Sequence, residues 1–350
     1  MKVRTKYLTA CVGLVAAGAV FLACSKAENR SRTEPNPKPT TRDKATTAVT
    51  KTPWASANKE LTIVNAYDAF GEPGAGMVKD FGFSAVIRYG GKTILFDSGT
   101  RADIFEGNLK ALGITAKDID IAIASHAHHD HIAGFDYLLR ENPKVQLLLP
   151  KDFFGLGSPL TFSIKGKEAN IAKTLAAKQR YFGGKRDLAK NKLESTGRFW
   201  KANVRYIESP TQILPGLTIL PTTSKLMGTF VRYPPFGKKP KLIGLPELSA
   251  SFSTSKGEVL VVGCSHSSVE EIVKAASKAG KGNIRLLTGG FHLLPYDRTY
   301  LEALAKRLKK EYAVKTVAPC HCTGHLAFSI LKQQFGDKYY LFGLGSKIEL

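Results

Sequence analysis

The sequence from residue 61 onward predicts an α/β fold in which helices cover β-sheets. Short apolar stretches of strand length alternate with stretches of helical spacing along this region. Gly90 and Gly91 separate the segments SAVIRY and KTILFD, which is the pattern of a two-residue β-hairpin. An early hairpin followed by alternating strands and helices is typical of sheets covered by helices. Residues 61–350 show no internal repeat and suffice for one large domain with its own core.

The expected elements follow from these periodicities. Strands are expected at residues 61–65, 84–89, 92–97, 119–124, 145–149, 217–220, 258–262, 284–288 and 340–343. Helices are expected at residues 101–112, 131–141, 167–178, 268–279 and 298–311. Ser268 and Glu271 have the spacing of a capping box, which supports a helix start at this point.

Residues 1–24 have the pattern of a bacterial lipoprotein signal peptide. Three cations precede an uncharged apolar run from Leu8 to Ala23, which is short for a membrane span of about 20 residues, although a retained anchor helix is the alternative. Phe-Leu-Ala before Cys24 resembles the lipoprotein cleavage box, so Cys24 is expected to carry the lipid. The sequence therefore predicts an exported protein of the bacterial cell envelope, anchored to the membrane through Cys24 and facing the periplasm or the cell exterior.

Residues 25–60 are rich in Lys, Thr, Ser and Pro and contain almost no apolar side chains. Such a segment cannot bury enough surface to offset the entropy of ordering it. We therefore expect a disordered tether between the signal peptide and a domain at residues 61–350.

The positive charge of the chain is concentrated in one segment. The formal net charge is +22, and residues 151–245 hold 18 Lys or Arg against 5 Asp or Glu. Residues 151–215 show little strand pattern, which predicts a basic, partly helical insertion that could act as a lid over a site. Positive charge of this density attracts phosphorylated substrates, anionic lipids or nucleic acid, while a solvated basic surface is the plain alternative.

The stretch SHAHHDHIAGF, residues 125–135, contains four of the eight histidines of the chain. It follows the apolar run IDIAIA and precedes a helix-like segment, so it lies on a strand-to-helix loop, where a rigid sheet presents ligating groups. A loosely solvated histidine tract is the alternative. The context favours a metal site that includes His126, His128, Asp130 and His131.

Two further histidines follow apolar strand-like runs. His266 in VVGCSH lies on another expected strand-to-helix loop, and His321 in VAPCHCTG lies between two thiols. No second Cys pair matches Cys320 and Cys322, which argues against a zinc finger. We expect His266 and His321 to join the site begun at His126, and both cysteines to point away and fill a packing role if the stretch is extended.

Two more residues have weaker signals. His292 follows Gly289 and Gly290 at the end of a strand-like run, which predicts a contact beside the metals or with the substrate, whereas a hydrogen-bonded core histidine is the alternative. Asp97 ends the run ILFD and could orient a ligating imidazole through its other ring nitrogen, or it could form a turn.

These motifs together resemble one family. The pattern H-x-H-x-D-H, placed after a strand and before a helix, resembles the metallo-β-lactamase superfamily. The order ILFDSGT, SHAHHDHIAGF, VVGCSH, GGFHL and CHCTG further resembles its branch of hydrolases similar to 7,8-dihydropterin-6-yl-methyl-4-(β-D-ribofuranosyl)aminobenzene 5'-phosphate synthase, over residues 61–350. The resemblance implies an αββα sandwich, two mixed sheets between helices, with metals at one edge.

The resemblance also implies a ligand set. His126, His128 and His266 would hold one metal ion, and Asp130, His131 and His321 would hold the other. Many members place a bridging aspartate after the strand that ends here at Val262. This chain has Gly-Cys-Ser-His instead, so either Cys264 or His266 is expected in that neighbourhood.

The expected function is that of a metal-dependent hydrolase with two divalent ions, zinc first and manganese or iron as alternatives. A metal-bound hydroxide would attack, and Asp130 or His292 would assist proton movement. The basic segment favours a small anionic phosphoester as substrate.

Four alternatives remain open from the sequence. They are a synthase-like transferase, a lactonase or β-lactamase, a nucleic-acid binder or nuclease, and a non-catalytic metal-binding lipoprotein. An exported protein is badly placed for the synthase-like reaction. No specific nucleic acid is expected, because no aromatic-rich basic recognition motif is present and the chain carries an export signal. The sequence does not predict an oligomeric state.

Overall fold

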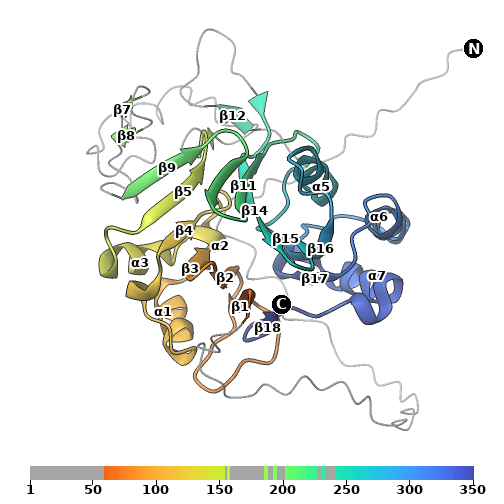
Figure 1. Ribbon diagram of the computed structural model, residues 1–350, viewed down its shortest axis with the longest axis horizontal. Coiled ribbons are helices and arrows are strands. Elements are labelled where there is room, and N and C mark those ends of the chain that lie inside the picture. Colours follow the sequence, from red (N-terminus) through yellow and green to blue (C-terminus); the bar gives the residue numbers. More distant parts are fainter. Residues whose placement is uncertain are drawn as a thin grey trace, which may run out of the picture. The chain divides into compact units, whose positions relative to one another are not determined.

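The structure is a computed structural model that describes residues 59–153, 202–227 and 243–350 (Figure 1). Between these ranges it describes only the backbone of short strands: β6 (Leu156–Gly157), β7 (Lys185–Asp187), β8 (Lys192–Glu194), β12 (Phe230–Arg232) and β13 (Leu242–Ile243). The expected signal peptide, Cys24, nearly all of the tether, the helix at 167–178 and most of the basic segment lie outside the described residues. Within the described part of the chain, every helix is too short or too polar to cross a membrane.

Two mixed sheets form the centre of the domain. The first has the strand order β18-β1-β2-β3-β4-β5-β9, and the second has the order β10-β11-β14-β15-β16-β17. The first sheet consists of β1 (Leu61–Tyr67), β2 (Ser84–Tyr89), β3 (Lys92–Phe96), β4 (Ile121–Ile123), β5 (Gln146–Pro150), β9 (Asn203–Ile207) and β18 (Lys347–Glu349). The second consists of β10 (Thr211–Leu214), β11 (Leu217–Thr222), β14 (Glu247–Thr254), β15 (Gly257–Val262), β16 (Ile284–Gly290) and β17 (Val317–Cys320). Strands β3, β4, β5 and β9 are parallel to one another, and so are β15, β16 and β17.

Helices cover the outer face of each sheet (Figure 1). The first sheet is covered by α1 (Ala102–Ala111), α2 (His129–Ile132) and α3 (Phe135–Glu141), and the second by α5 (Val269–Lys278), α6 (Arg298–Lys310) and α7 (His325–Phe335). Three single-turn helices complete the described elements: η1 (Ala116–Asp118), η3 (His321–Thr323) and η4 (Gly336–Lys338).

The strand sequences explain the layers. In β15, Val259 and Val261 lie in the core between the two sheets, while Leu260 and Val262 pack against the outer helices. The same alternation holds in β4, where Ile121 faces the inner core and Ala122 faces the helices. Strands that are apolar on both faces must be covered on both, and this produces the αββα sandwich expected from the resemblance.

Most expected elements of the described chain are present, and the hairpin is confirmed. Gly90 and Gly91 have φ angles of 56° and 73°, which is the left-handed conformation that a tight hairpin turn requires. The helix expected at 131–141 is broken into α2 and α3 near Gly134, where a Cβ atom would lie 2.1 Å from the carbonyl oxygen of Ser98.

The strand expected at 340–343 is wrong, and the edge strand is β18. Phe342 is buried in the core between the sheets, but its carbonyl oxygen accepts a hydrogen bond from the Asn65 side chain at 2.7 Å instead of pairing with a strand. Apolar character alone therefore misidentified as a strand a loop that buries Phe342 and exposes Tyr340 and Leu341.

Helix α7 and strands β9, β10 and β14 are among the elements that the sequence analysis missed. Helix α7 and strand β14 have regular apolar spacing that a stricter search could have found, since Leu248, Ala250 and Phe252 alternate with serines. Strands β9 and β10 lie inside the range 151–215 expected for the insertion, and each is the edge strand of one sheet.

Candidate metal centre

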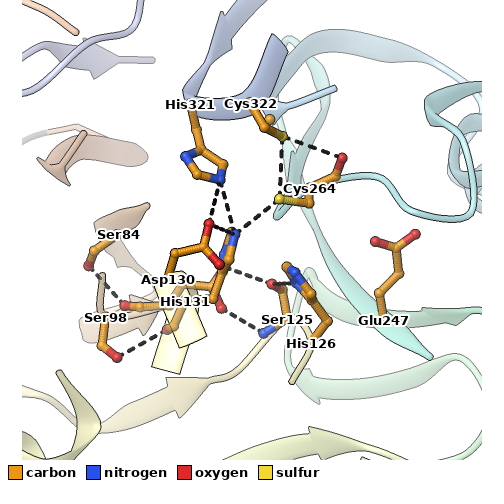
Figure 2. Close-up of polar contacts among 12 residues, drawn as sticks. Ser84, Ser98, Ser125, His126, Asp130, His131, Glu247, Cys264, His321 and Cys322 are labelled. Carbon is orange, nitrogen blue, oxygen red and sulfur yellow. Dashed lines mark hydrogen bonds and ion pairs between the residues drawn. The ribbon is translucent and has the colours of Figure 1, made fainter. Parts of the chain in front are cut away.

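The site residues lie where parallel strands of both sheets end. In the first sheet, Asp97 follows β3 and the His126 loop follows β4. In the second sheet, Cys264 and His266 follow β15, while His321 follows β17. The carboxyl ends of parallel strands meet at one edge of a sheet, so the topology itself brings these loops together. Figure 2 shows His126, His131, Cys264 and His321 converging on the same place.

The first group of potential ligands is His126, His128 and His266. Their ligating atoms all lie within 4.8 Å of one another. The ring centroid of His126 lies 4.7 Å from that of His128 and 4.8 Å from that of His266. The Nε2 atoms of His126 and His266 are buried and find no hydrogen-bond partner in the described part of the chain. A buried polar atom without a partner costs free energy, and a metal ion would supply the missing interaction.

The second group is Asp130, His131 and His321, whose ligating atoms also lie within 4.8 Å of one another. The Nε2 atoms of His131 and His321 are 3.2 Å apart, and Oδ2 of Asp130 lies 3.4 Å from Nε2 of His321. Two imidazoles and a carboxylate therefore direct their ligating atoms at one point, as the resemblance implied.

Cys264 lies between the two groups. Its Sγ atom is 3.0 Å from Nε2 of His131, and with His126 and His131 it forms another cluster of ligating atoms within 4.8 Å. The sequence left open whether Cys264 or His266 takes the place of a bridging carboxylate. The structure places the Cys264 thiol between the two groups and His266 within the first group.

Asp97 orients the first histidine loop. Its Oδ2 atom lies 2.6 Å from Nδ1 of His131 and accepts a hydrogen bond from the Ser125 hydroxyl at 2.7 Å, while Oδ1 accepts from the Ser125 amide. The Ser125 hydroxyl also lies 2.9 Å from Nδ1 of His126. These contacts hold two imidazoles with their Nε2 atoms turned toward the site, which is the orienting role expected for Asp97.

Two buried carboxylates that sequence reasoning missed hold the loops of the second sheet. Glu247 accepts hydrogen bonds from the backbone amides of His266 and Ser267 at 2.9 and 2.6 Å. Asp68 accepts from the backbone amide of His321 at 3.1 Å. Both bonds join residues distant in sequence, and no local pattern marks either carboxylate in advance. Burial raises the pKa of Glu247 to about 7.

His292 and Cys322 form another cluster of ligating atoms with Cys264. The ligating atoms of Cys264, His292 and Cys322 lie within 4.8 Å of one another, and the His292 ring is 4.3 Å from that of His266. The prediction that Cys322 points away is wrong, because residues 321–323 form a single helical turn and not an extended strand. Cys320 does point away, into the core between the sheets. His129, the fourth histidine of the first loop, is exposed and belongs to none of these clusters.

The charges of the site suit a cation. Burial lowers the pKa of His126 and His266 far below the usual range and that of His128 to about 4, so all three are neutral at pH 7 and have a lone pair to donate. Burial opposes a charge on His321, yet Cys322, Asp130 and Asp68 raise its pKa to about 9. The second group thus favours a positive charge, which a metal ion would supply in place of the proton.

The donor types also fit. Neutral imidazoles, one carboxylate and a thiol are ligands preferred by zinc and similar transition metals, whereas magnesium and calcium prefer oxygen ligands alone. The residues present therefore fit a two-metal centre.

The chain is similar to several known proteins. Residues 78–206 match the family model of the metallo-beta-lactamase superfamily. The chain is 27% identical over 270 residues to a 7,8-dihydropterin-6-methyl-4-(beta-D-ribofuranosyl)-aminobenzene-5'-phosphate synthase of Methanocaldococcus jannaschii, covering 74% of this chain and 84% of that protein. It is 28% identical over 259 residues to an uncharacterized protein of the same organism, covering 72% and 87%.

A solved structure shows the fold. The crystal structure of a metal-dependent hydrolase of the beta-lactamase superfamily aligns with a TM-score of 0.62 at 24% sequence identity, over 83% of this chain and 99% of that chain. The two-sheet sandwich is thus the fold that this solved structure has.

Proposed function

We propose that this chain is a two-metal hydrolase of the metallo-β-lactamase superfamily that acts on a small anionic phosphoester. One observation carries the proposal. Residues from three strand ends, spread from His126 to His321, direct their ligating atoms into two adjacent clusters with Cys264 between them. Structural zinc sites need only one closed set of four ligands, so adjoining clusters fit a reactive centre better.

The bound cations would supply Lewis acidity, lowering the pKa of a water molecule to about 7 and polarising the oxygen of the group under attack. Asp130 is the group in the second cluster placed to handle protons. Its side chain is 22% exposed, whereas those of His131 and His321 are fully buried. Burial raises the pKa of Asp130. The neighbouring His131 and His321 have the opposite effect and lower this pKa well below its usual value, so Asp130 is an ionised carboxylate that can accept a hydrogen bond from water.

His292 is the second candidate for proton movement. Its ring lies beside His266 and its Nδ1 atom is buried without a hydrogen-bond partner among the residues described here. That position adjoins the first cluster, so the imidazole could hold a leaving-group oxygen or a phosphoryl oxygen.

The preference for an anionic substrate rests on charge. The excess of 13 positive charges between residues 151 and 245 follows from the 18 basic and 5 acidic side chains. An excess of positive charge attracts anions and accelerates their association with a protein. Neutral lactones and lactams gain nothing from it, which is why we rank a phosphoester first.

A synthase-like transferase is the second candidate. The similarity to the Methanocaldococcus jannaschii synthase extends over most of both chains, and this favours a reaction on a phosphorylated ribosyl compound. Hydrolysis and condensation would use the same metals, so the products distinguish them.

The experiment is metal analysis of the purified full-length protein together with an activity panel of phosphoesters, a lactone, a β-lactam and the synthase substrates. We expect two divalent ions per chain and phosphoesterase activity that a chelator abolishes and zinc restores. His128→Ala should lose this activity with the fold intact by circular dichroism, while His129→Ala, which changes an exposed histidine one position away, should retain it. If the metal-loaded protein turned over only the synthase substrates, the proposed reaction would be a condensation and not a hydrolysis.

Export and attachment through Cys24 stay part of the proposal. Mass spectrometry of the protein from a bacterial membrane fraction should find a lipid on Cys24. A free, unprocessed N-terminus in that fraction would contradict it.

A further inference from the structure

Two thiols lie in contact at the edge of the candidate metal centre. The Sγ atoms of Cys264 and Cys322 are 3.3 Å apart, and these residues stand 58 positions apart in the sequence (Figure 2). Each residue is 3% exposed. Cys264 follows β15 and Cys322 lies in the turn η3 after β17, so the contact depends on the arrangement of three parallel strands.

The two loops are held so that the thiols stay together. The Thr323 hydroxyl donates to the carbonyl oxygen of Cys320 at 2.7 Å and accepts from the amide of Phe291 at 3.1 Å, which fixes the turn that carries Cys322. The Ser265 hydroxyl donates to the carbonyl oxygen of Gly290 at 2.7 Å, which ties the Cys264 loop to β16.

Gly290 fills the space between these loops. A Cβ atom at this position would lie 2.8 Å from Sγ of Cys322 and 2.5 Å from the carbonyl oxygen of Gly263. The loops are thus packed against the backbone of β16, with little room for the sulfur atoms to move apart.

We propose that Cys264 and Cys322 form a reversible disulfide whose formation competes with metal binding. In this reaction each thiol loses its hydrogen, one S–S bond forms, and the two electrons and two protons reduce a low-molecular-weight disulfide to two thiols. An S–S bond is about 2.05 Å long, so the sulfur atoms need to approach by only about 1 Å. The inference rests on the proposed function in one respect, namely that Cys264 lies at the metal centre.

The competition follows from the position of Cys264. Its thiol is 3.0 Å from Nε2 of His131 and within ligating reach of His126. A thiolate is a strong metal ligand, whereas a disulfide sulfur carries no charge and binds metals poorly. Oxidation therefore removes the ligand between the two clusters, and a bound metal ion in turn protects the thiol from oxidation.

The third described cysteine provides an internal control. Cys320 is completely buried in the core between the sheets, two residues before Cys322. The number of residues between Cys264 and Cys320 is only two smaller than that between Cys264 and Cys322, but Cys320 faces away from the site. Cys320→Ala should therefore leave the oxidation of the other pair unchanged.

The test uses the full-length protein, stripped of metal or loaded with zinc, and treated with oxidised glutathione. Free thiols are then alkylated, and the digested protein is mapped by mass spectrometry. We expect a Cys264–Cys322 cross-linked peptide in the metal-free protein and alkylated Cys320 after denaturation. Zinc loading should slow cross-linking at least tenfold, and the oxidised protein should bind at least one zinc ion fewer until a dithiol reduces it.

Cys322→Ser keeps Cys264 but removes its partner. Its zinc content should be the same before and after treatment with oxidised glutathione, because Cys264 has no partner left with which to form the disulfide. If it fails to fold, Cys322→Ala and the wild-type peptide map serve the same purpose. Absence of the 264–322 peptide from metal-free protein, its pairing with Cys11 or Cys24 instead, or unchanged zinc content after cross-linking would each overturn the proposal. Zinc competition without phosphoester turnover would reject only the proposed function.

Discussion

The two sheets contribute to the candidate centre in different ways. The first sheet supplies His126, His128, Asp130 and His131 from one six-residue stretch after β4. The second supplies its ligating atoms from three separate strand ends, including those that precede Cys264 and His321. The first set is fixed mainly by local backbone geometry, whereas the second depends on strand register and on how the sheets pack. One part of this metal site thus comes from a local sequence motif, and the other part exists only because the fold brings distant residues together.

The register of the second sheet shows this dependence. Val262 pairs with Gly289 across β15 and β16, and Gly290 pairs with Cys320 across β16 and β17. A shift of one residue would move the next side chain to the other face of the sheet. The two halves meet where the backbone amide of Leu248 donates to the carbonyl oxygen of Ser125 at 2.8 Å.

His126→Ala should have the largest effect of the changes considered, because His126, like His131, belongs to two clusters of ligating atoms. Its imidazole is grouped with His128 and His266 and also with His131 and Cys264. We expect loss of both metal ions and a fall in activity of more than about 100-fold, since even partners outside the ligand shell are worth about 10–100-fold in metal affinity. Metal analysis by mass spectrometry checks this. Retention of two ions would contradict the shared position.

His321→Ala tests the half that depends on the fold. This imidazole belongs to the second cluster only, so we expect the metal content to fall from two ions to one while the first cluster stays loaded. The exposed His129, changed to Ala, is the matched control and should keep both ions. Equal loss of both ions in His321→Ala would mean that the two clusters cannot be filled independently.

This contrast also explains how much the sequence could predict. The first loop was predicted as a group because its spacing is local, and the αββα class followed from the strand and helix pattern together with the resemblance. Cys322 was placed on the wrong side because a single turn at residues 321–323 replaces an extended strand there. Glu247 and Asp68 had no signal at all, since their partners are backbone amides of loops 19 and 253 residues away. Such contacts exist only once the sheets have packed.

Asp97→Asn should weaken the first half without removing a ligand. The Asp97 carboxylate contacts Nδ1 of His131 and both the amide and the hydroxyl of Ser125. An amide is uncharged and presents a donor where one of these partners needs an acceptor. We expect metal affinity to fall by about 10–100-fold, with the stoichiometry at saturation still two. Titration with zinc against a chelating indicator measures this, and unchanged affinity would show that Asp97 forms only a turn.

Gly263→Ala should have the smallest effect on metal binding. It tests the contact between the loops of the two sheets. A Cβ atom at Gly263 would lie 2.2 Å from Oγ and 2.6 Å from Cβ of Ser125. The Ser125 hydroxyl cannot easily move, because it is hydrogen-bonded to Asp97 and lies beside His126. Overpacking of this kind typically lowers the free energy of unfolding by about 1–3 kcal/mol.

The matched control is Gly107→Ala in α1, where an added Cβ atom would meet nothing within 4 Å. Because alanine favours a helix over glycine, this change should raise the free energy of unfolding by up to about 1 kcal/mol. Urea denaturation of both variants, with and without zinc, measures the difference. If the site depends on contact between the sheets, zinc should stabilise Gly263→Ala less than wild type and Gly107→Ala equally. Equal stabilisation of all three would show that the first loop binds metal without the support of the second sheet.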